Sequence, residues 1–357
     1  MSTVELDHVT VRGGRTPRLR EVSMSIDDGA LVAVVGASGS GKTSLLRAVA
    51  GLDRVDQGAV MLDGVDVTRA TPAERDVGMV FQTPALIGHL SARRNVSFPL
   101  DVRRVASDEI RRRVDAEARA LHIEQLMDRE PTTLSVGEQQ MVQIARALVR
   151  VPNVLLLDEP FASLDDQFRG RMRAEFAVLQ SGYQVTTLMT TNDSADVEAL
   201  AGMVAVLDGG RLVQFGDTPV VRRAPVNLLA AAATGPLSLI EMTVVAAPQG
   251  FWFQREDPSS GELVRIRAWS PALAGHVGAS VTVGLRPEDV EIADSGTIPA
   301  TIRSTARFGP AGAACLVAGV RVGALPRAGS RPAVGSAVRL RVHHHVVFDR
   351  SDDRRIG

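Results

Sequence analysis

The stretch Gly36-Ala37-Ser38-Gly39-Ser40-Gly41-Lys42-Thr43 decides the fold of this chain. It follows an apolar run, residues 31–35, that is typical of a strand, and it leads into residues 44–50, which have the pattern of a helix. A strand, a glycine-rich loop and a helix in this order are the context of a phosphate-binding loop. A glycine turn ahead of an ordinary helix is the alternative, but the full motif and both flanking elements coincide here.

The residue types in this loop suit a phosphate group. Glycines at positions 36, 39 and 41 allow the backbone to point its N–H groups inward. The helix behind the loop adds unpaired N–H groups and the positive end of its dipole. Lys42 is predicted to reach the terminal phosphates, and the hydroxyl of Thr43 is predicted to bind Mg²⁺.

Lys42 is the only lysine among the 40 basic residues of the chain, so the other 39 (40 − 1) are arginines. A compact ammonium group on a flexible stem fits a tight phosphate cradle, whereas a broad planar guanidinium does not. The sequence uses arginine at every other basic position. We therefore expect that Lys42 is required for the chemistry of the site.

Length and composition limit the possible classes of protein. A chain of 357 residues is expected to hold about two or three domains. The formal net charge of −1 argues against nucleic acid as a partner. The single cysteine, Cys315, is typical of a reducing compartment rather than of a disulfide framework. No signal peptide and no membrane-spanning segment are expected from the sequence.

A second chemical motif follows a helical region. Residues 154–157 form an apolar strand pattern that ends in the carboxylates Asp158 and Glu159. An aspartate delivered by a buried strand beside a phosphate loop suits Mg²⁺ binding. The adjacent Glu159 is placed to act as general base on an attacking water. A strand that ends in two solvated acids is the alternative, and the upstream phosphate loop argues against it.

The remaining pattern predicts a layered α/β domain. Residues 4–11 and 21–26 alternate as an antiparallel pair, and residues 58–67 are expected to form a hairpin that turns at positions 63–64. Further strands are predicted at 77–81, 184–189 and 203–207, so that strands and helices alternate as in a largely parallel sheet. Helical spacing after residue 91 predicts a helical insertion at about residues 88–150.

Together these residues resemble the ATP-binding subunits of ABC transporters. Residues 72–82 look like the approach to the glutamine loop of that family and end at Gln82, residues 134–138 resemble its signature loop, and residues 163–165 look like the loop that links two subunits. The resemblance covers roughly residues 4–232. It implies an α/β P-loop ATPase domain, assigned to residues 1–235, with a mixed sheet and the helical insertion.

Residues 236–357 are expected to form a second, all-β domain. Short strand patterns separated by Gly, Pro and Asp turns occur at 263–267, 280–285, 301–308 and 338–342, which is typical of a small barrel. The stretch 284–290 looks like the opening of the OB-like regulatory barrel found after maltose-type importer ATPases. Relatives with that tail also serve iron, sulfate, molybdate and polyamine importers.

The resemblance implies roles for individual residues. Two nucleotide-binding subunits, expected to be a homodimer, would clamp ATP head to tail, with Ser135 and Gly137 of one facing residues 36–43 of the other. Gln82 would contact Mg²⁺ and report to the transmembrane permease subunits. The apolar Leu86 and Ile87 are expected to be exposed for that partner. The chain is expected at the cytoplasmic face of the membrane, and a solute-binding protein would act indirectly.

Three positions depart from the family pattern. Arg12 stands where an aromatic residue usually stacks on adenine, and its guanidinium can also stack on a base. Val136-Gly137 replaces the usual double glycine of the signature, although Ser135 and Gly137 remain. Asn192 occupies the position of the switch histidine. Asn192 is therefore included among the predicted catalytic residues, with Glu159 and Gln82.

The sequence thus predicts an ATP-hydrolysing subunit of a bacterial importer, most simply for a sugar. An importer for iron, polyamine or sulfate remains open, as does a nucleotide-binding gate that hydrolyses little. A related ATPase that acts on DNA or ribosomes is a further alternative, but it usually has paired ATPase domains or a long coiled insertion. The predicted ATP-contacting set is Gly36, Ala37, Ser38, Gly39, Ser40, Gly41, Lys42, Thr43, Arg12, Ser135 and Gly137, and the predicted Mg²⁺ ligands are Thr43, Gln82 and Asp158.

Overall fold

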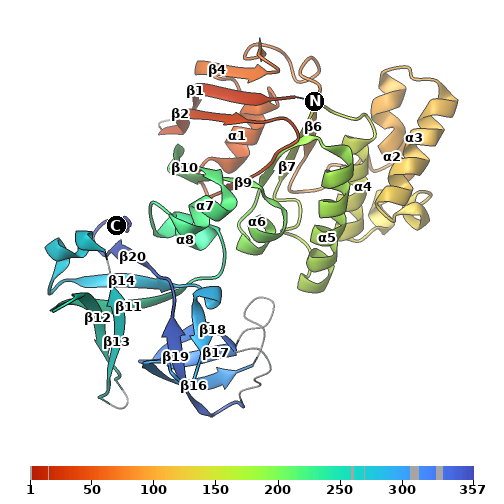
Figure 1. Cartoon of the computed structure of the whole chain (residues 1–357). Helices are drawn as coiled ribbons and strands as arrows, with labels where there is room; N and C mark the ends of the chain where they lie inside the picture. The colour runs from red at the N-terminus through yellow and green to blue at the C-terminus, as the bar shows by residue number, and fades with distance from the viewer. Residues whose placement is uncertain (1, 15, 259–260, 269, 306–312, 327–332) are drawn as a thin grey trace. The chain divides into compact units, whose positions relative to one another are not determined.

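The computed structural model describes residues 2–14, 16–258, 261–268, 270–305, 313–326 and 333–357. The chain divides into two units between Thr218 and Pro219. This division comes before the boundary expected after residue 235, so that residues 219–235 are grouped with the second unit. Figure 1 shows both units, with the first coloured red to green and the second green to blue.

A six-stranded sheet lies at the centre of the first unit, in the order β10-β9-β3-β8-β7-β6. The strands are β3 (Leu31–Val35), β6 (Val77–Val80), β7 (Val154–Asp158), β8 (Thr186–Thr190), β9 (Met203–Asp208) and β10 (Arg211–Asp217). All pairs are parallel except β9 with β10. Every residue of β3, β7 and β8 is buried, because parallel strands are covered on both faces. This explains their unbroken apolar runs.

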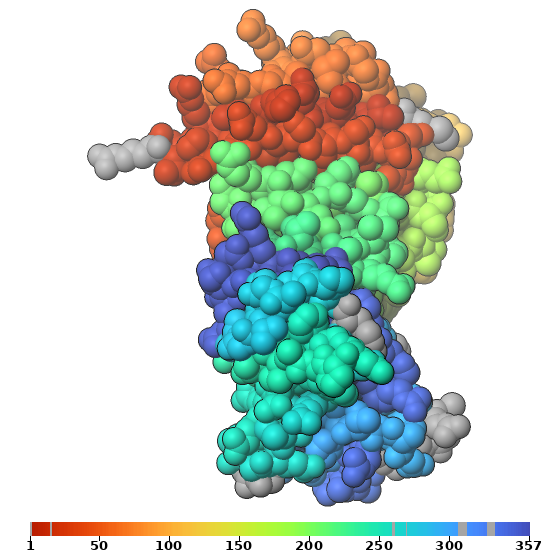
Figure 2. Space-filling model, turned by 60° about the vertical axis from the view of Figure 1, so that its left-hand side comes forward, coloured from red at the N-terminus to blue at the C-terminus, as the bar shows by residue number. Residues whose placement is uncertain are grey.

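A second sheet in this unit is antiparallel and has the order β2-β1-β4-β5. It consists of β1 (Val4–Gly13), β2 (Thr16–Ile26), β4 (Gln57–Leu62) and β5 (Val65–Asp66). The predicted hairpin turn is confirmed, since Asp63 and Gly64 both adopt positive φ, as a type I′ turn requires. Figure 2 shows the surface of the first strands in red. The N–H of Arg20, on β2, donates to the oxygen of Gly210 (2.8 Å), next to β10.

Helices cover these sheets. They are α1 (Lys42–Val49), α2 (Ala92–Val102), α3 (Ser107–Ala120), α4 (Val136–Leu148), α5 (Asp166–Tyr183) and α6 (Ser194–Leu200), with 3₁₀ turns η1 (Glu124–Leu126) and η2 (Pro131–Thr133). The region between β6 and β7 contains α2, α3 and α4, as the helical spacing predicts. Their buried faces form one apolar core with β7 and α5, so the helical region packs on the sheet that carries Asp158.

The second unit contains two β structures. One is an open sheet in the order β13-β12-β11-β14-β20, and the other is a closed barrel, β15-β18-β17-β16-β19. The open sheet has β11 (Ser238–Ala247), β12 (Gly250–Glu256), β13 (Leu263–Ala268), β14 (Ser280–Leu285) and β20 (Val346–Asp349). The barrel has β15 (Val290–Ile292), β16 (Ile298–Ser304), β17 (Ala313–Val317), β18 (Val320–Pro326) and β19 (Ala337–Val342).

The five-stranded barrel agrees with the predicted OB-like fold. Two of the predicted strands, 263–267 and 280–285, belong instead to the open sheet, and the predicted end of a strand at Phe308 lies outside the described residues. The sheet and the barrel share one apolar core, which is why their strands have the same alternating pattern. The unit also contains most of α7 (Thr218–Arg223), α8 (Leu228–Ala233), η3 (Pro271–His276) and η4 (Pro287–Asp289).

Candidate nucleotide site

The predicted phosphate loop joins β3 to α1, as the sequence indicates. A side chain at Gly36 would place its Cβ 2.1 Å from the carbonyl oxygen of Leu207, and one at Gly41 would approach the oxygen of Arg18 to 2.6 Å. All three loop glycines, 36, 39 and 41, have positive φ. No side chain caps the N-terminus of α1, so its first N–H groups face the loop as an anion site.

Lys42 lies at the start of α1 and is buried. Its Nζ donates to the carbonyl oxygens of Gly36 (2.8 Å) and Ala37 (3.1 Å), so the ammonium group lies across the loop. Burial lowers the pKa of Lys42, while the carboxylates of Glu159 and Asp158 oppose this shift. The ammonium group therefore interacts electrostatically with both predicted acids.

Thr43 and Asp158 come together as predicted. The Thr43 hydroxyl donates to Oδ1 of Asp158 (3.1 Å), and the Thr190 hydroxyl donates to the same oxygen (2.8 Å). Asp158 is buried at the end of β7. A hydroxyl oxygen in contact with a carboxylate oxygen is a donor set that Mg²⁺ accepts. The residues present therefore fit the ion that a phosphate site of this kind uses.

Glu159 is held by both predicted catalytic amides. Nε2 of Gln82 donates to Oε2 of Glu159 (3.1 Å), and Nδ2 of Asn192 donates to Oε1 (2.6 Å). The backbone N–H of Glu159 donates to the hydroxyl of Thr190 (2.9 Å), and its φ is +45°. The structure thus brings Gln82, Glu159 and Asn192 together beside Asp158, within reach of the phosphate loop.

Thr190 is a site residue that sequence reasoning missed. Its hydroxyl binds both Asp158 and the N–H of Glu159, so one side chain fixes both acids. The residue is fully buried at the end of β8. A polar residue at the end of a buried parallel strand, next to the strand of the two acids, is the signal that points to this role.

Ser135 and Gly137 lie at the start of α4. Ser135 is the N-cap of this helix and forms a capping box with Glu138. A Cβ at Gly137 would lie 2.9 Å from side-chain atoms of Leu164 and Phe168, so this position packs on the loop that precedes α5. The Ser135 hydroxyl contacts Glu138, and the Ser135 carbonyl oxygen accepts from the N–H of Gln139 (2.9 Å).

Arg12 lies near the end of β1 with an exposed side chain. Its backbone N–H donates to Oδ2 of Asp56 (2.7 Å). The prediction that Leu86 and Ile87 are exposed is wrong, because both side chains are half-buried. Leu86 packs against the helical core, and Asn95 exchanges hydrogen bonds with the backbone of Ile87 (2.7 and 3.1 Å).

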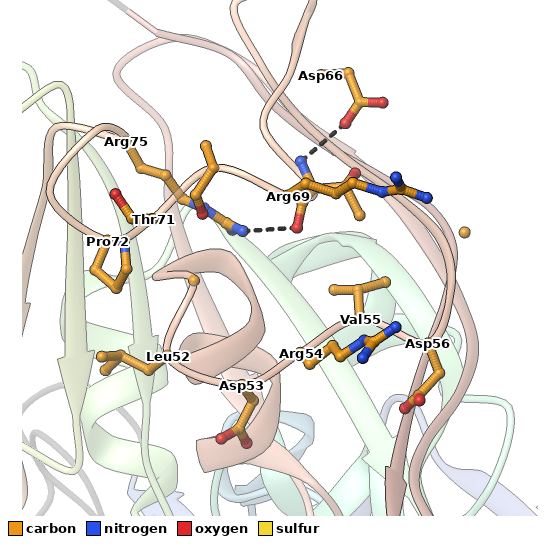
Figure 3. A pocket seen from close by; sticks show the side chains of 14 residues that line it. Leu52, Asp53, Arg54, Val55, Asp56, Asp66, Arg69, Thr71, Pro72 and Arg75 are labelled. Carbon is orange, nitrogen blue, oxygen red and sulfur yellow. Dashed lines mark hydrogen bonds between the residues drawn. The ribbon is translucent and has the colours of Figure 1, made fainter.

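A pocket of about 1010 Å³ lies at the opposite end of α1 from the phosphate loop. Figure 3 shows its lining, with Arg54, Asp56, Asp66 and Arg69 around the opening. Arg75 forms the wall and donates to four carbonyl oxygens, including two of the α1 terminus. The pocket is lined by as many acidic side chains as basic ones. It therefore lacks the excess of positive charge that favours a phosphate group.

Comparison with known proteins shows the family of the chain. Residues 19–162 match the family model described as ABC transporter. The sn-glycerol-3-phosphate import ATP-binding protein of Ruegeria pomeroyi is 34% identical over 309 residues, which are 87% of this chain and 85% of that protein. The chain belongs to the ABC transporter family.

Other relatives of this ABC protein are named for the import of different solutes. The maltose/maltodextrin import ATP-binding protein of Yersinia pestis is 37% identical, over 81% of this chain and 78% of that protein. The sulfate/thiosulfate import ATP-binding protein of Caulobacter vibrioides is 38% identical, over 82% and 84%. The family match and these relatives show that the chain is an ABC ATPase.

A solved structure supports the same fold. It is an ATP-binding cassette described as dimeric, in a post-hydrolysis state bound to ADP and Pi, and it is 28% identical to this ABC protein. The match has a TM-score of 0.55 and covers 60% of this chain and 98% of that one. Within the part of the chain that the structure describes, no helix is long and apolar enough to cross a membrane.

Proposed function

We propose that this ABC protein is the ATP-hydrolysing subunit of a bacterial solute importer, and that the solute is a sugar. The observation that carries the proposal is the contact of Glu159 with both Gln82 and Asn192, next to the Thr43–Asp158 pair. These are the groups that a reaction at the terminal phosphate of ATP needs. The names of the relatives support import, of a sugar for one of them.

ATP would bind between two copies of the chain, head to tail. The loop of residues 36–43 and the N-terminus of α1 would surround the phosphates, with Lys42 exchanging its two carbonyl partners for phosphate oxygens. Ser135 and Gly137 of the second copy would close the site from the other side, and Arg12 would stack on the base. The dimeric state of the solved relative and the exposed position of Val136 support this arrangement.

Thr43, Asp158 and Gln82 would hold Mg²⁺. When bound there, the ion would neutralise charge on the phosphate oxygens. The contact of Gln82 with Glu159 uses its Nε2, so its Oε1 is the atom that would bind the ion. A side chain in contact with both the ion and the base is suited to report the state of the site to the permease subunits.

Glu159 would act as the general base. Its carboxylate would accept a proton from the attacking water, while Asn192 would hold that carboxylate and donate to the γ-phosphate. A histidine can become cationic as negative charge develops, and a neutral amide cannot. The subunit is therefore expected to hydrolyse ATP slowly but measurably.

The partners would be the transmembrane permease subunits and, through them, a solute-binding protein, at the cytoplasmic face of the membrane. The decisive experiment is to purify the chain with its membrane partners, to measure ATP hydrolysis, and to identify the bound solute. A sugar-stimulated ATPase supports the proposal. A complex that binds ATP without hydrolysing it favours a nucleotide-dependent gate, and stimulation by sulfate, iron or a polyamine overturns the sugar assignment.

A further inference from the structure

One guanidinium group, that of Arg169, connects two loops around the nucleotide site. Arg169 lies in the first turn of α5. Its Nε donates to the oxygen of Phe161 (3.2 Å), its Nη2 to the oxygen of Leu164 (2.8 Å), and its Nη1 to Oδ2 of Asp193 (3.4 Å). Phe161 and Leu164 belong to the loop that runs from Glu159 to α5, and Asp193 belongs to the loop that carries Asn192.

Asp193 is the point at which this connection reaches Asn192. Its Oδ1 accepts from the N–H of Ala195 (2.9 Å) at the start of α6. Its Oδ2 accepts from Arg173 as well as from Arg169, and Arg173 also donates to Asp196. Only 23% of the Arg169 side chain and 16% of the Arg173 side chain are exposed, so these pairs are better shielded from solvent than surface pairs.

Thr191, which precedes Asn192, is also held by hydrogen bonds. The N–H of Thr191 donates to the oxygen of Val34 (3.2 Å), and its hydroxyl donates to Asp196. Asn192 therefore lies between two immobilised neighbours. Its own side chain is exposed, and its amide donates to Glu159 at 2.6 Å. The position of that amide is decided by the backbone on both sides of it.

We propose that Arg169 is a positioning residue for ATP hydrolysis, which holds the Asn192 amide against Glu159 through Asp193. This inference rests on the proposed roles of Glu159 and Asn192. A planar fork with five N–H donors can satisfy three acceptors in different directions, whereas an ammonium group presents a single point of charge. Because Leu164 belongs to the loop expected to contact the second subunit, a movement of that loop also moves the group that holds Asp193.

The test compares Arg169→Gln with the matched variant Arg171→Gln in the full chain assembled with its membrane partners. Arg171 lies on the same helix, and its side chain is 64% exposed and paired with Glu175. We expect Arg169→Gln to lower kcat by about tenfold to a hundredfold, since small displacements of catalytic groups have effects of this size. The KM for ATP should stay within about twofold, and Arg171→Gln should resemble the wild type. Equal kcat in the two variants would overturn the inference.

A double variant identifies the route of the effect. If Arg169 acts through Asn192, Arg169→Gln should lower kcat little further in an Asn192→Ala background, because the two changes remove one function. If the two substitutions lower kcat by factors that multiply, Arg169 acts independently of Asn192. That result would overturn this inference but not the proposed function. An inactive wild type would contradict the proposed function and this inference together.

A milder variant covers the case in which Arg169→Gln does not fold. Asp193→Asn keeps an oxygen to accept from Ala195 and removes the charge that faces Arg169 and Arg173. We expect kcat to fall by about threefold to tenfold, as charge-assisted hydrogen bonds become neutral ones, with unchanged affinity for labelled ATP. An Asp193→Asn protein that folds and has wild-type kcat would overturn the proposed connection.

Discussion

The amide Nδ2 of Asn192 donates to Oε1 of Glu159 at 2.6 Å. Gln82 occupies the other oxygen of the same carboxylate, so the proposed base has an amide donor on each side. A carboxylate with both oxygens engaged has fewer lone pairs left for a water. A carboxylate has about four acceptor positions, so Glu159 can still accept a proton from a water while both amides hold it. The second hydrogen of the Asn192 amide is left to donate to the γ-phosphate.

Replacing Asn192 by histidine tests this relationship. We expect Asn192→His to raise kcat by up to about tenfold to a hundredfold, because an imidazole can become cationic in the transition state and one such donor is typically worth 10²–10³ in rate. The KM for ATP should change little, since the gain is confined to the transition state. Steady-state hydrolysis by the assembled transporter is the measurement. An unchanged or lower kcat would show that this site orders its water in another way.

Replacing Lys42 tests the phosphate loop. Lys42→Ala should weaken ATP binding by about 1.5–3 kcal/mol, the value of charge-assisted hydrogen bonds. Lys42→Arg should also bind weakly, because the larger planar group does not fit between the oxygens of Gly36 and Ala37. Titration with labelled ATP measures both, with Arg47→Ala on the same helix as the control. Wild-type affinity in Lys42→Ala would refute the assigned role.

Replacing Glu159 by glutamine separates binding from hydrolysis. Glu159→Gln keeps the shape of the side chain and removes its ability to accept a proton. We expect ATP affinity to be retained, hydrolysis to fall below detection, and the ATP-bound pair of subunits to accumulate in size-exclusion chromatography. Residual hydrolysis near the wild-type rate would mean that another group is the base.

Glu117 predicts a pH dependence of stability. It is buried on α3 and accepts from the hydroxyl of Tyr183 (2.7 Å). Burial raises the pKa of Glu117 above its ordinary 4.5, although the Tyr183 hydroxyl opposes the shift. The folded protein therefore binds this proton more tightly than the unfolded chain, and the free energy of unfolding should fall as the pH rises above about 4.5 through the raised pKa.

The control for this effect is Glu117→Gln, which cannot ionise and keeps an acceptor for Tyr183. We expect the stability of this variant to depend less on pH above about pH 4.5, and to exceed that of the wild type at the upper end by about 1.4 kcal/mol for each pKa unit of the shift. Urea unfolding at a series of pH values measures both proteins. Parallel pH profiles would show that Glu117 titrates normally.

The elements of the first unit follow from local patterns. The phosphate loop between β3 and α1, the acids at the end of β7 and the helices between β6 and β7 can all be recognised, since each depends on residues close together in the chain. Lys42 and Thr43 could be assigned in the same way, because the residues of the phosphate loop are adjacent in the chain and the loop conformation fixes their positions. Asn192 could be identified only through the resemblance to a family.

The contacts between these motifs were decided by the tertiary structure. Gln82 and Asn192 are 77 and 33 residues from Glu159 in sequence, and no periodicity states which amide will reach which oxygen. The same is true of Thr190 between the two acids and of Arg169 between two loops. Half-burial of Leu86 likewise depends on the helical core, and the place of Ile87 depends on Asn95, which lie on other segments.

The second unit shows most clearly what a sequence pattern cannot predict. Alternating apolar residues predict its strands, because a strand that is buried on one face has a period of two. That period is the same in an open sheet and in a barrel, so it does not tell which strands pair. The pairing of β11 with β14 and the closure of β15 through β19 are set by the shared apolar core that the folded chain must fill.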